Sequence, residues 1–156
     1  MLITTGRDPG TEGRSVARAL FLSFPGSRLE GRGRRTLASQ LSRARKLHFS
    51  RVCTIYREQN HPCSISFISL GNSGEWERLS PEVRIRSIRA FPFPKRTLQS
   101  ACLSIKGAKA AVLRRLADAP ACEPGEPASA ISAGASEISF SLQGKKIMEL
   151  GVSYEA

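Results

Sequence analysis

The residues best suited to chemistry lie near the N-terminus, in a loop rich in glycine and arginine. A short apolar run at Leu2 and Ile3 precedes this loop, and a segment with helical spacing follows it. Glycines permit a tight backbone path, and a helix start presents free N–H groups and the positive end of the helix dipole. Arg7 and Arg14 flank that point. The stretch from residue 2 to 35 therefore predicts a surface that binds anions.

A second basic site follows the first helical segment, at Arg32, Arg34 and Arg35. The net charge of the chain is +11, and residues 1 to 60, with 12 basic and 4 acidic side chains, supply 12 − 4 = +8 of it. Of the 24 basic residues 18 are arginine, whose planar fork pairs two phosphate oxygens better than lysine does. This excess of basic over acidic side chains favours a nucleic-acid partner. A general preference for arginine, or adaptation to heat, is the alternative explanation.

Patterns for catalysis or metal binding are missing from the sequence. His48 and His61 are the only histidines, and neither belongs to a metal spacing or a nucleophile-and-base pattern. The four cysteines are scattered without a C-x-x-C pair, which indicates neither a zinc site nor a dense disulfide framework and favours idle thiols. We predict a protein that is not an enzyme, with no catalytic residue, no metal and no cofactor.

The loop from Gly6 to Gly13 leaves one enzymatic alternative open. A phosphate-binding loop of the Walker type that ends at Gly13 needs glycine at position 8 and lysine at position 14, where this chain has Asp8 and Arg14. The Rossmann spacing fails as well. A plain strand-to-helix turn is the favoured interpretation. A nucleotide-binding enzyme is the weaker one, and a loop packed shut without a pocket would remove it.

Hydrophobic periodicity predicts the elements that position these residues. A helix begins at Thr11 and ends at the Pro25-Gly26 turn, and residues 27–29 form a short strand. Thr36 is suited to cap a second helix, which buries Leu41 and Ala44 and turns Arg43 and Lys46 outward. The later elements are a hairpin of strands 52–56 and 65–70, a strand over 83–88, a strand over 103–105, a helix over 108–117, a flexible loop over 120–136, and a hairpin of strands 138–142 and 147–152.

These elements predict an α/β fold with central mixed sheets and packed helices. We expect a single domain over residues 1–156, with halves of about 1–80 and 81–156, because each half runs through helical material into a closing hairpin. The chain has no apolar run near eighteen residues and no secretory leader pattern, so we expect a soluble, cytoplasmic protein without a membrane partner.

Four short motifs and one leucine recur in the first part of a known family's pattern: Ile3-Thr4-Thr5-Gly6-Arg7, Gly13-Arg14-Ser15, Phe24-Pro25-Gly26, Arg32-Gly33 and Leu37. Together they resemble the N-terminal pattern of Brix-domain ribosome-biogenesis proteins, in their short archaeal, Imp4-like form. The position of the first hairpin, with its end at Ile68 to Gly71, agrees with this resemblance. It spans most of the chain and is specific in roughly the first 70 residues.

The resemblance implies two similar halves related to the anticodon-binding domain of class IIa aminoacyl-tRNA synthetases. It also implies an archaeal protein that binds pre-ribosomal RNA and assists rRNA processing and small-subunit assembly, together with other assembly proteins. No aromatic residue appears interleaved with the arginines, so we expect recognition of RNA shape and backbone rather than base stacking. The predicted RNA-binding residues are Arg7, Arg14, Arg18, Arg32, Arg34, Arg35, Arg43 and Lys46.

A module that docks another assembly protein is the main rival hypothesis. An exposed apolar patch on the second half would favour it.

Overall fold

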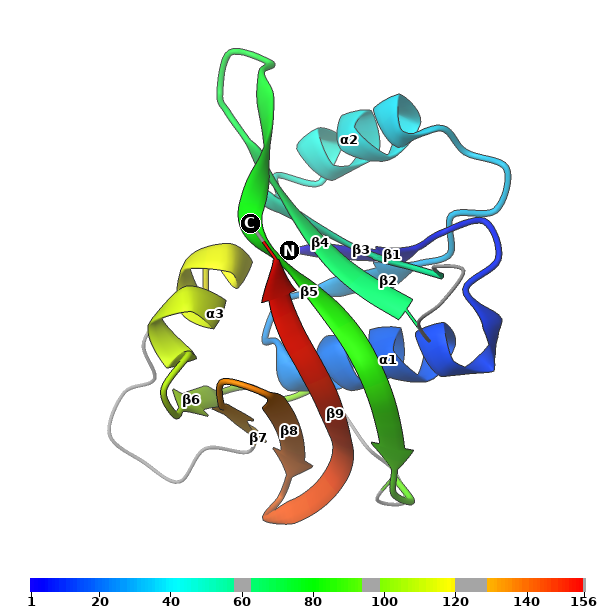
Figure 1. Cartoon of the computed structure of the whole chain (residues 1–156). Coiled ribbons are helices and arrows are strands. Elements are labelled where there is room, and N and C mark those ends of the chain that lie inside the picture. The colour runs from blue at the N-terminus through cyan, green and yellow to red at the C-terminus, as the bar shows by residue number, and fades with distance from the viewer. Residues whose placement is uncertain (58–62, 94–98, 120–128, 156) are drawn as a thin grey trace.

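The computed structural model describes residues 1–57, 63–93, 99–119 and 129–155, which form a mixed α/β fold as predicted (Figure 1). The predicted mixed sheets are one continuous sheet of nine strands, and three helices pack on it. The elements are β1 (Leu2–Thr5), α1 (Gly10–Ser23), β2 (Arg28–Glu30), α2 (Leu37–Lys46), β3 (Arg51–Tyr56), β4 (Cys63–Leu70), β5 (Trp76–Ala90), β6 (Leu103–Lys106), α3 (Ala110–Ala117), β7 (Ser129–Ala133), β8 (Glu137–Leu142) and β9 (Lys145–Glu155).

The strand order of the sheet is β2-β1-β3-β4-β5-β9-β8-β7-β6. Strand β1 is parallel to β2 and β3, and β6 is parallel to β7, while all other neighbours are antiparallel. Each half thus contains a parallel pair that leads into an antiparallel meander, and the two meanders join where β5 pairs with β9. The boundary expected near residue 80 falls inside β5, which pairs with both halves.

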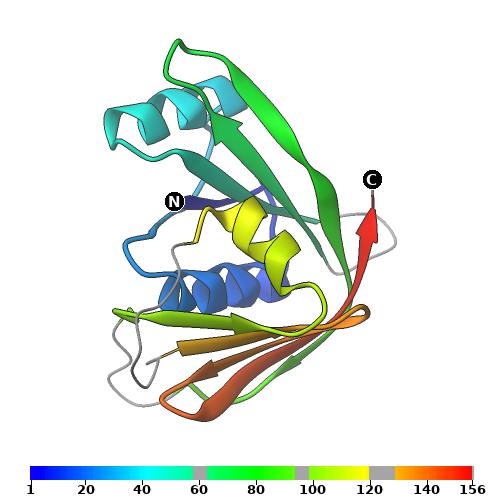
Figure 2. The same ribbon diagram turned by 90° about the vertical axis from the view of Figure 1, so that its left-hand side faces the viewer.

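Helix α1 lies in the hollow of the curved sheet (Figure 2). Its apolar side chains recur at helical spacing, so Val16, Ala17 and Leu20 are all buried to 1% exposure or less. They belong to a single core cluster that also contains inward residues of β1, β3, β4 and β5, of the strands β6 to β9, and of α3. Both halves of the chain therefore depend on the same helix for their core.

Polar groups of the second half also hold the end of α1. The last carbonyls of a helix have no partner within it. The Ser100 amide donates to Leu22 O at 2.9 Å, and Ser129 Oγ donates to Ser23 O at 2.9 Å. The amide nitrogen of the Gln99 side chain lies 3.1 Å from Phe21 O. Since residues 78 or more positions away make these bonds, the end of α1 and the second half form as one unit.

Helix α2 covers the opposite face of the sheet. The predicted cap is confirmed, because the Thr36 side chain accepts a hydrogen bond from the Ser39 amide at 3.2 Å. Leu41 and Ala44 face inward as predicted, in a second and smaller core cluster with residues of β1, β3 and β4. The two faces of the sheet near β1 are thus covered by different helices.

Two expectations from sequence need correction. Of the flexible loop expected over 120–136, residues 120–128 lie outside the described residues, but Ser129–Ala133 form β7 in the middle of a sheet. Cys53 and Cys63 are buried free thiols, whereas Cys102 is disulfide-bonded, so it is not an idle thiol. Within the described ranges, no helix is long and apolar enough to cross a membrane.

The shared core predicts that a cavity in α1 destabilises the whole molecule. Replacing Leu20, which is 1% exposed, by alanine should lower the free energy of unfolding by about 2 to 5 kcal/mol. Chemical denaturation followed by circular dichroism measures this change. Thr11→Ala, at an exposed position of the same helix, is the control and should change stability by less than about 0.5 kcal/mol. Equal effects of the two substitutions would contradict the shared core.

Candidate nucleic-acid interface

The loops after β1 and β2 diverge from the edge of the sheet. Strand β1 leads to α1 in the hollow, and its parallel neighbour β2 leads to α2 on the other face. In open α/β sheets such a divergence leaves a crevice at the carboxyl ends of the strands, where ligands bind. Gly6 lets the chain leave β1 close to β3, because a Cβ at this position would lie 3.1 Å from Tyr56 Cβ.

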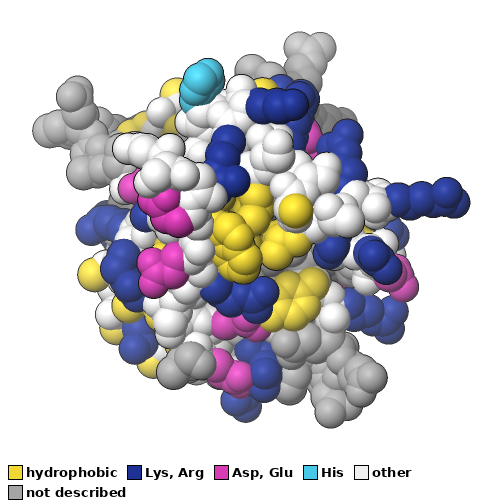
Figure 3. Space-filling model, turned by 90° about the horizontal axis from the view of Figure 1, so that it is seen from above, with side chains coloured by type: hydrophobic (Ala, Val, Ile, Leu, Met, Phe, Trp, Pro, Cys, Tyr) yellow, Lys and Arg dark blue, Asp and Glu magenta, His cyan; other side chains and the backbone are white. Residues whose placement is uncertain are grey.

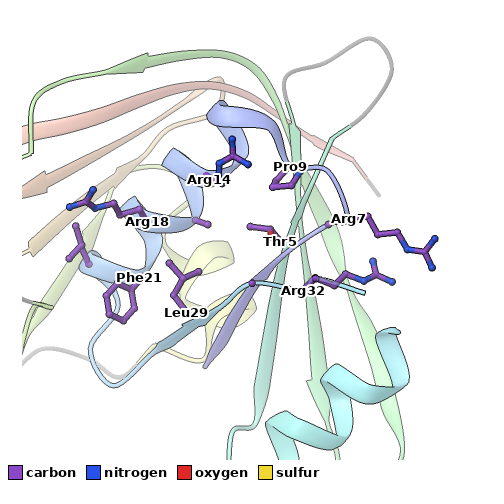
Figure 4. A pocket seen from close by; sticks show the side chains of 13 residues that line it. Thr5, Arg7, Pro9, Arg14, Arg18, Phe21, Leu29 and Arg32 are labelled. Carbon is purple, nitrogen blue, oxygen red and sulfur yellow. The ribbon is translucent and has the colours of Figure 1, made fainter. Parts of the chain in front are cut away.

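A pocket of about 610 Å³ occupies this crevice, and we name it the α1–β2 pocket after the elements on either side (Figure 4). It contains four of the predicted RNA-binding residues. Arg7 follows β1, Arg32 follows β2, and Arg14 and Arg18 project from α1. In Figure 4, Arg7 and Arg32 extend from one end of the pocket, whereas Arg14 and Arg18 lie on the side of α1. The fold therefore gathers basic residues that lie up to 25 positions apart in the sequence.

Contacts fix the direction of two of these arginines. The Arg32 Nε donates a hydrogen bond to Arg35 O at 2.9 Å, which restrains the Arg32 side chain. The Arg18 guanidinium carbon lies 4.8 Å from the centre of the Phe93 ring, a cation–π contact. Arg18 is thereby tied to a residue far along the chain. Such contacts lower the entropy lost when an arginine binds a phosphate.

A second cluster of arginines surrounds Glu30. The Glu30 carboxylate pairs with Arg28 at 2.8 Å, Arg35 at 3.2 Å and Arg43 at 3.3 Å. Burial alone would raise the pKa of Glu30, but the hydrogen bond from Arg43 and the charges of the three arginines outweigh it, so the pKa lies below its ordinary value. The three arginines and one glutamate leave a net charge of 3 − 1 = +2. Arg35 and Arg43 thus anchor the loop after β2, in addition to any contact with RNA.

The other two predicted residues lie apart from the pocket. Arg34 is exposed in the loop after β2, and Lys46 is exposed at the end of α2. Figure 3 views the molecule from above, and its right-hand margin carries many basic side chains. Figure 1 places the loops after β1 and β2 on this same side. The pocket therefore opens on a basic side of the molecule.

Two apolar residues of the pocket were not predicted from sequence. Phe21 on α1 and Leu29 on β2 line it and lie near each other in Figure 4. A signal for Phe21 was present, because Arg14, Arg18 and Phe21 stand at i, i+4 and i+7 and so share one helix face. The expectation that no aromatic residue is interleaved with the arginines is therefore wrong at this helix. No comparable signal pointed to Leu29, which is 36% exposed.

The geometry bears on the nucleotide-binding alternative. The loop after Gly6 is not packed shut, since Gly6, Arg7 and Pro9 line the α1–β2 pocket. Among the described residues, no group of three His, Cys, Asp or Glu side chains is arranged to hold a metal ion, and His61 lies outside them. The pocket thus offers cations and apolar surface for binding.

The Glu30 cluster predicts a pH-dependent contribution to stability. Since folding lowers the pKa of Glu30 below 4.5, its stabilisation is present above pH 4.5 and is lost as pH falls through the lowered pKa. Glu30→Gln should reduce stability at pH 7 by about 1 kcal/mol, because solvent screens the half-exposed arginines. It should also flatten the loss of stability below pH 4.5. Thermal unfolding at pH 3 to 7 measures both effects.

Glu137→Gln, at an exposed position of β8, is the matched control. If its pH profile and stability matched those of Glu30→Gln, the Glu30 cluster would have no structural role.

Comparison with known proteins identifies the fold. No protein-family model and no curated protein matches the sequence. A probable ribosomal biogenesis protein from Aeropyrum pernix K1 matches with a TM-score of 0.78 at 15% identity, over 99% of this chain and 96% of that chain. Mil, an archaeal Imp4-like protein, matches with a TM-score of 0.65 at 21% identity, over 97% and 96%. The chain therefore has the fold of these two proteins over nearly its whole length, as its resemblance to Imp4-like Brix-domain proteins predicted.

Proposed function

We propose that this protein is a Brix-domain ribosome-biogenesis factor that binds pre-ribosomal RNA without catalysing a reaction. The observation that carries the proposal is the arrangement of Arg7, Arg14, Arg18 and Arg32 around one pocket. The fold, shared with a probable ribosomal biogenesis protein and an Imp4-like protein, supports the biological setting. The related likeness to anticodon-binding domains of class IIa aminoacyl-tRNA synthetases is part of this proposal.

The proposed mechanism is positioning. Guanidinium groups on both sides of the α1–β2 pocket hold phosphates, and Arg34 and the cationic Glu30 cluster extend the basic surface along the loop after β2. A chain of RNA held this way is kept in one conformation while rRNA is processed and the small subunit assembles. Since each phosphate contact releases counterions, affinity falls steeply as salt rises.

Docking of another assembly protein is the alternative function, and the distribution of apolar surface weakens it. An exposed apolar patch on the second half would have favoured this alternative. The large apolar side chains that are exposed among the described residues are Leu29 and Trp76, and both belong to the first half. Of these two side chains, Leu29 lines the same pocket as the arginines, so this exposed apolar surface belongs to the proposed RNA site.

Removing the pocket arginines should weaken RNA binding and its dependence on salt. In the variant Arg7→Ala, Arg14→Ala, Arg18→Ala and Arg32→Ala, affinity for a ribosomal RNA fragment should fall at least about tenfold at moderate salt. The slope of log affinity against log salt should become shallower by about 3, at about 0.7 per lost phosphate contact with a single strand. Fluorescence anisotropy across a salt series measures both.

A control with the same loss of charge replaces four exposed basic residues of the second half of the sheet. They are Arg86, Arg89, Lys106 and Lys145, each changed to alanine. If this control lost as much affinity and slope as the pocket variant, binding would depend on total charge alone and the proposed site would be wrong.

A further inference from the structure

We propose that the α1–β2 pocket holds one unpaired nucleotide of the RNA, with its base against Phe21 and Leu29 and its flanking phosphates on the arginines. This inference rests on the proposed function and names the part of the RNA that the site selects. It departs from the expectation of backbone recognition alone, because the structure places apolar surface between the basic groups.

The floor of the pocket is too apolar for a site that binds only phosphate. Ala17 and Leu22 are buried beneath it, Phe21 is half-buried, and Leu29 is 36% exposed on the edge strand β2. A phosphate group gains nothing from such surface. A nucleobase gains from it, because the π-face of any of the four bases stacks on aromatic and apolar side chains.

The size of the pocket suits a single nucleotide. Its volume of about 610 Å³ lies in the range of about 300 to 1,000 Å³ that is typical of pockets for small molecules. A base that is paired and stacked in a duplex cannot enter a recess between a helix and an edge strand. The occupant therefore comes from a loop, a bulge or a single-stranded end of the RNA.

The arginines stand where the backbone of that nucleotide enters and leaves. Arg7 and Arg32 lie at one end of the pocket, and Arg14 and Arg18 lie along α1 (Figure 4). Charges on two sides of an apolar floor match a strand with a phosphate on each side of an inserted base. The guanidinium carbon of Arg18 lies 4.8 Å from the centre of the Phe93 ring, so this phosphate-binding group is held in position before RNA binds.

Glycines keep the mouth of the pocket open. Gly31 and Gly33 line it, and a Cβ added at either would meet no atom within 4 Å. Gly31 does not have a positive φ, so it can accept a side chain without backbone strain. Gly31→Leu therefore narrows the pocket while it leaves both the core and the charge unchanged.

The test compares two RNA probes on the full-length protein. One probe is a single-stranded RNA of twelve nucleotides that is unable to pair with itself. The other is a series of strands of the same sequence, each with a single abasic site at a different position. Every strand of the series keeps all its phosphates and lacks one base. We expect the abasic strand that lacks the inserted base to bind about tenfold more weakly than the intact strand, at an unchanged salt slope.

Three variants should remove this difference between the probes. Phe21→Ala, Phe21→Leu and Gly31→Leu should weaken binding of the intact strand about tenfold and leave binding of that abasic strand unchanged. Phe21→Leu keeps apolar packing against the core, so it remains informative if Phe21→Ala unfolds. Trp76→Ala is the matched control, because it removes a large apolar side chain that is 49% exposed and does not line the pocket, and it should change binding of neither probe.

The outcomes separate the two proposals. Equal binding of all intact and abasic strands, with a normal effect of the arginine variant, would overturn the inserted base and keep RNA binding; the apolar floor would then suit a protein segment. If Phe21→Leu and Gly31→Leu weakened binding of the intact and the abasic strands equally, the inserted base would also be overturned. Absence of RNA binding by any probe would instead contradict the proposed function itself.

Discussion

The burial of α1 in the hollow of the sheet is the interaction on which the rest of the structure depends. One face of this helix supplies the core for strands of both halves, and Gln99, Ser100 and Ser129 of the second half bond its last carbonyls. A helix enclosed on so many sides keeps only a narrow stripe at the surface. That stripe carries Arg14, Arg18 and Phe21, so the requirement for a core also sets where the exposed groups stand.

The second constraint is the divergence of the chain after β1 and β2. Because α1 and α2 cover opposite faces, the two loops separate and leave the α1–β2 pocket between them. The loop after β2 has few apolar anchors, and the Glu30 carboxylate holds it through Arg35 and Arg43. A single acidic residue thus organises cations that would otherwise repel one another, and the surface nevertheless stays positive.

Local patterns in the sequence predicted much of this fold. The helix after Gly10, the Thr36 cap and both hairpins were predicted from spacing, because each depends on residues near one another in the chain. Strand β7 was missed because its sequence, Ser-Ala-Ile-Ser-Ala, has one large apolar residue and lacks a strand signal of its own; pairing with β6 and β8 makes it a strand. Leu29 and the contacts of Glu30 depend on the packing of β2, which local spacing does not describe.

The central claim is that RNA occupies the α1–β2 pocket. Amide chemical shifts of ¹⁵N-labelled protein, followed by NMR during titration with a single-stranded fragment of ribosomal RNA, test it most directly. The account predicts that shifts concentrate in residues 5–22 and 29–34, and that α3, at Ala110–Ala117, stays unchanged. Shifts centred on α3 and β6, or spread evenly over the basic surface, would contradict it.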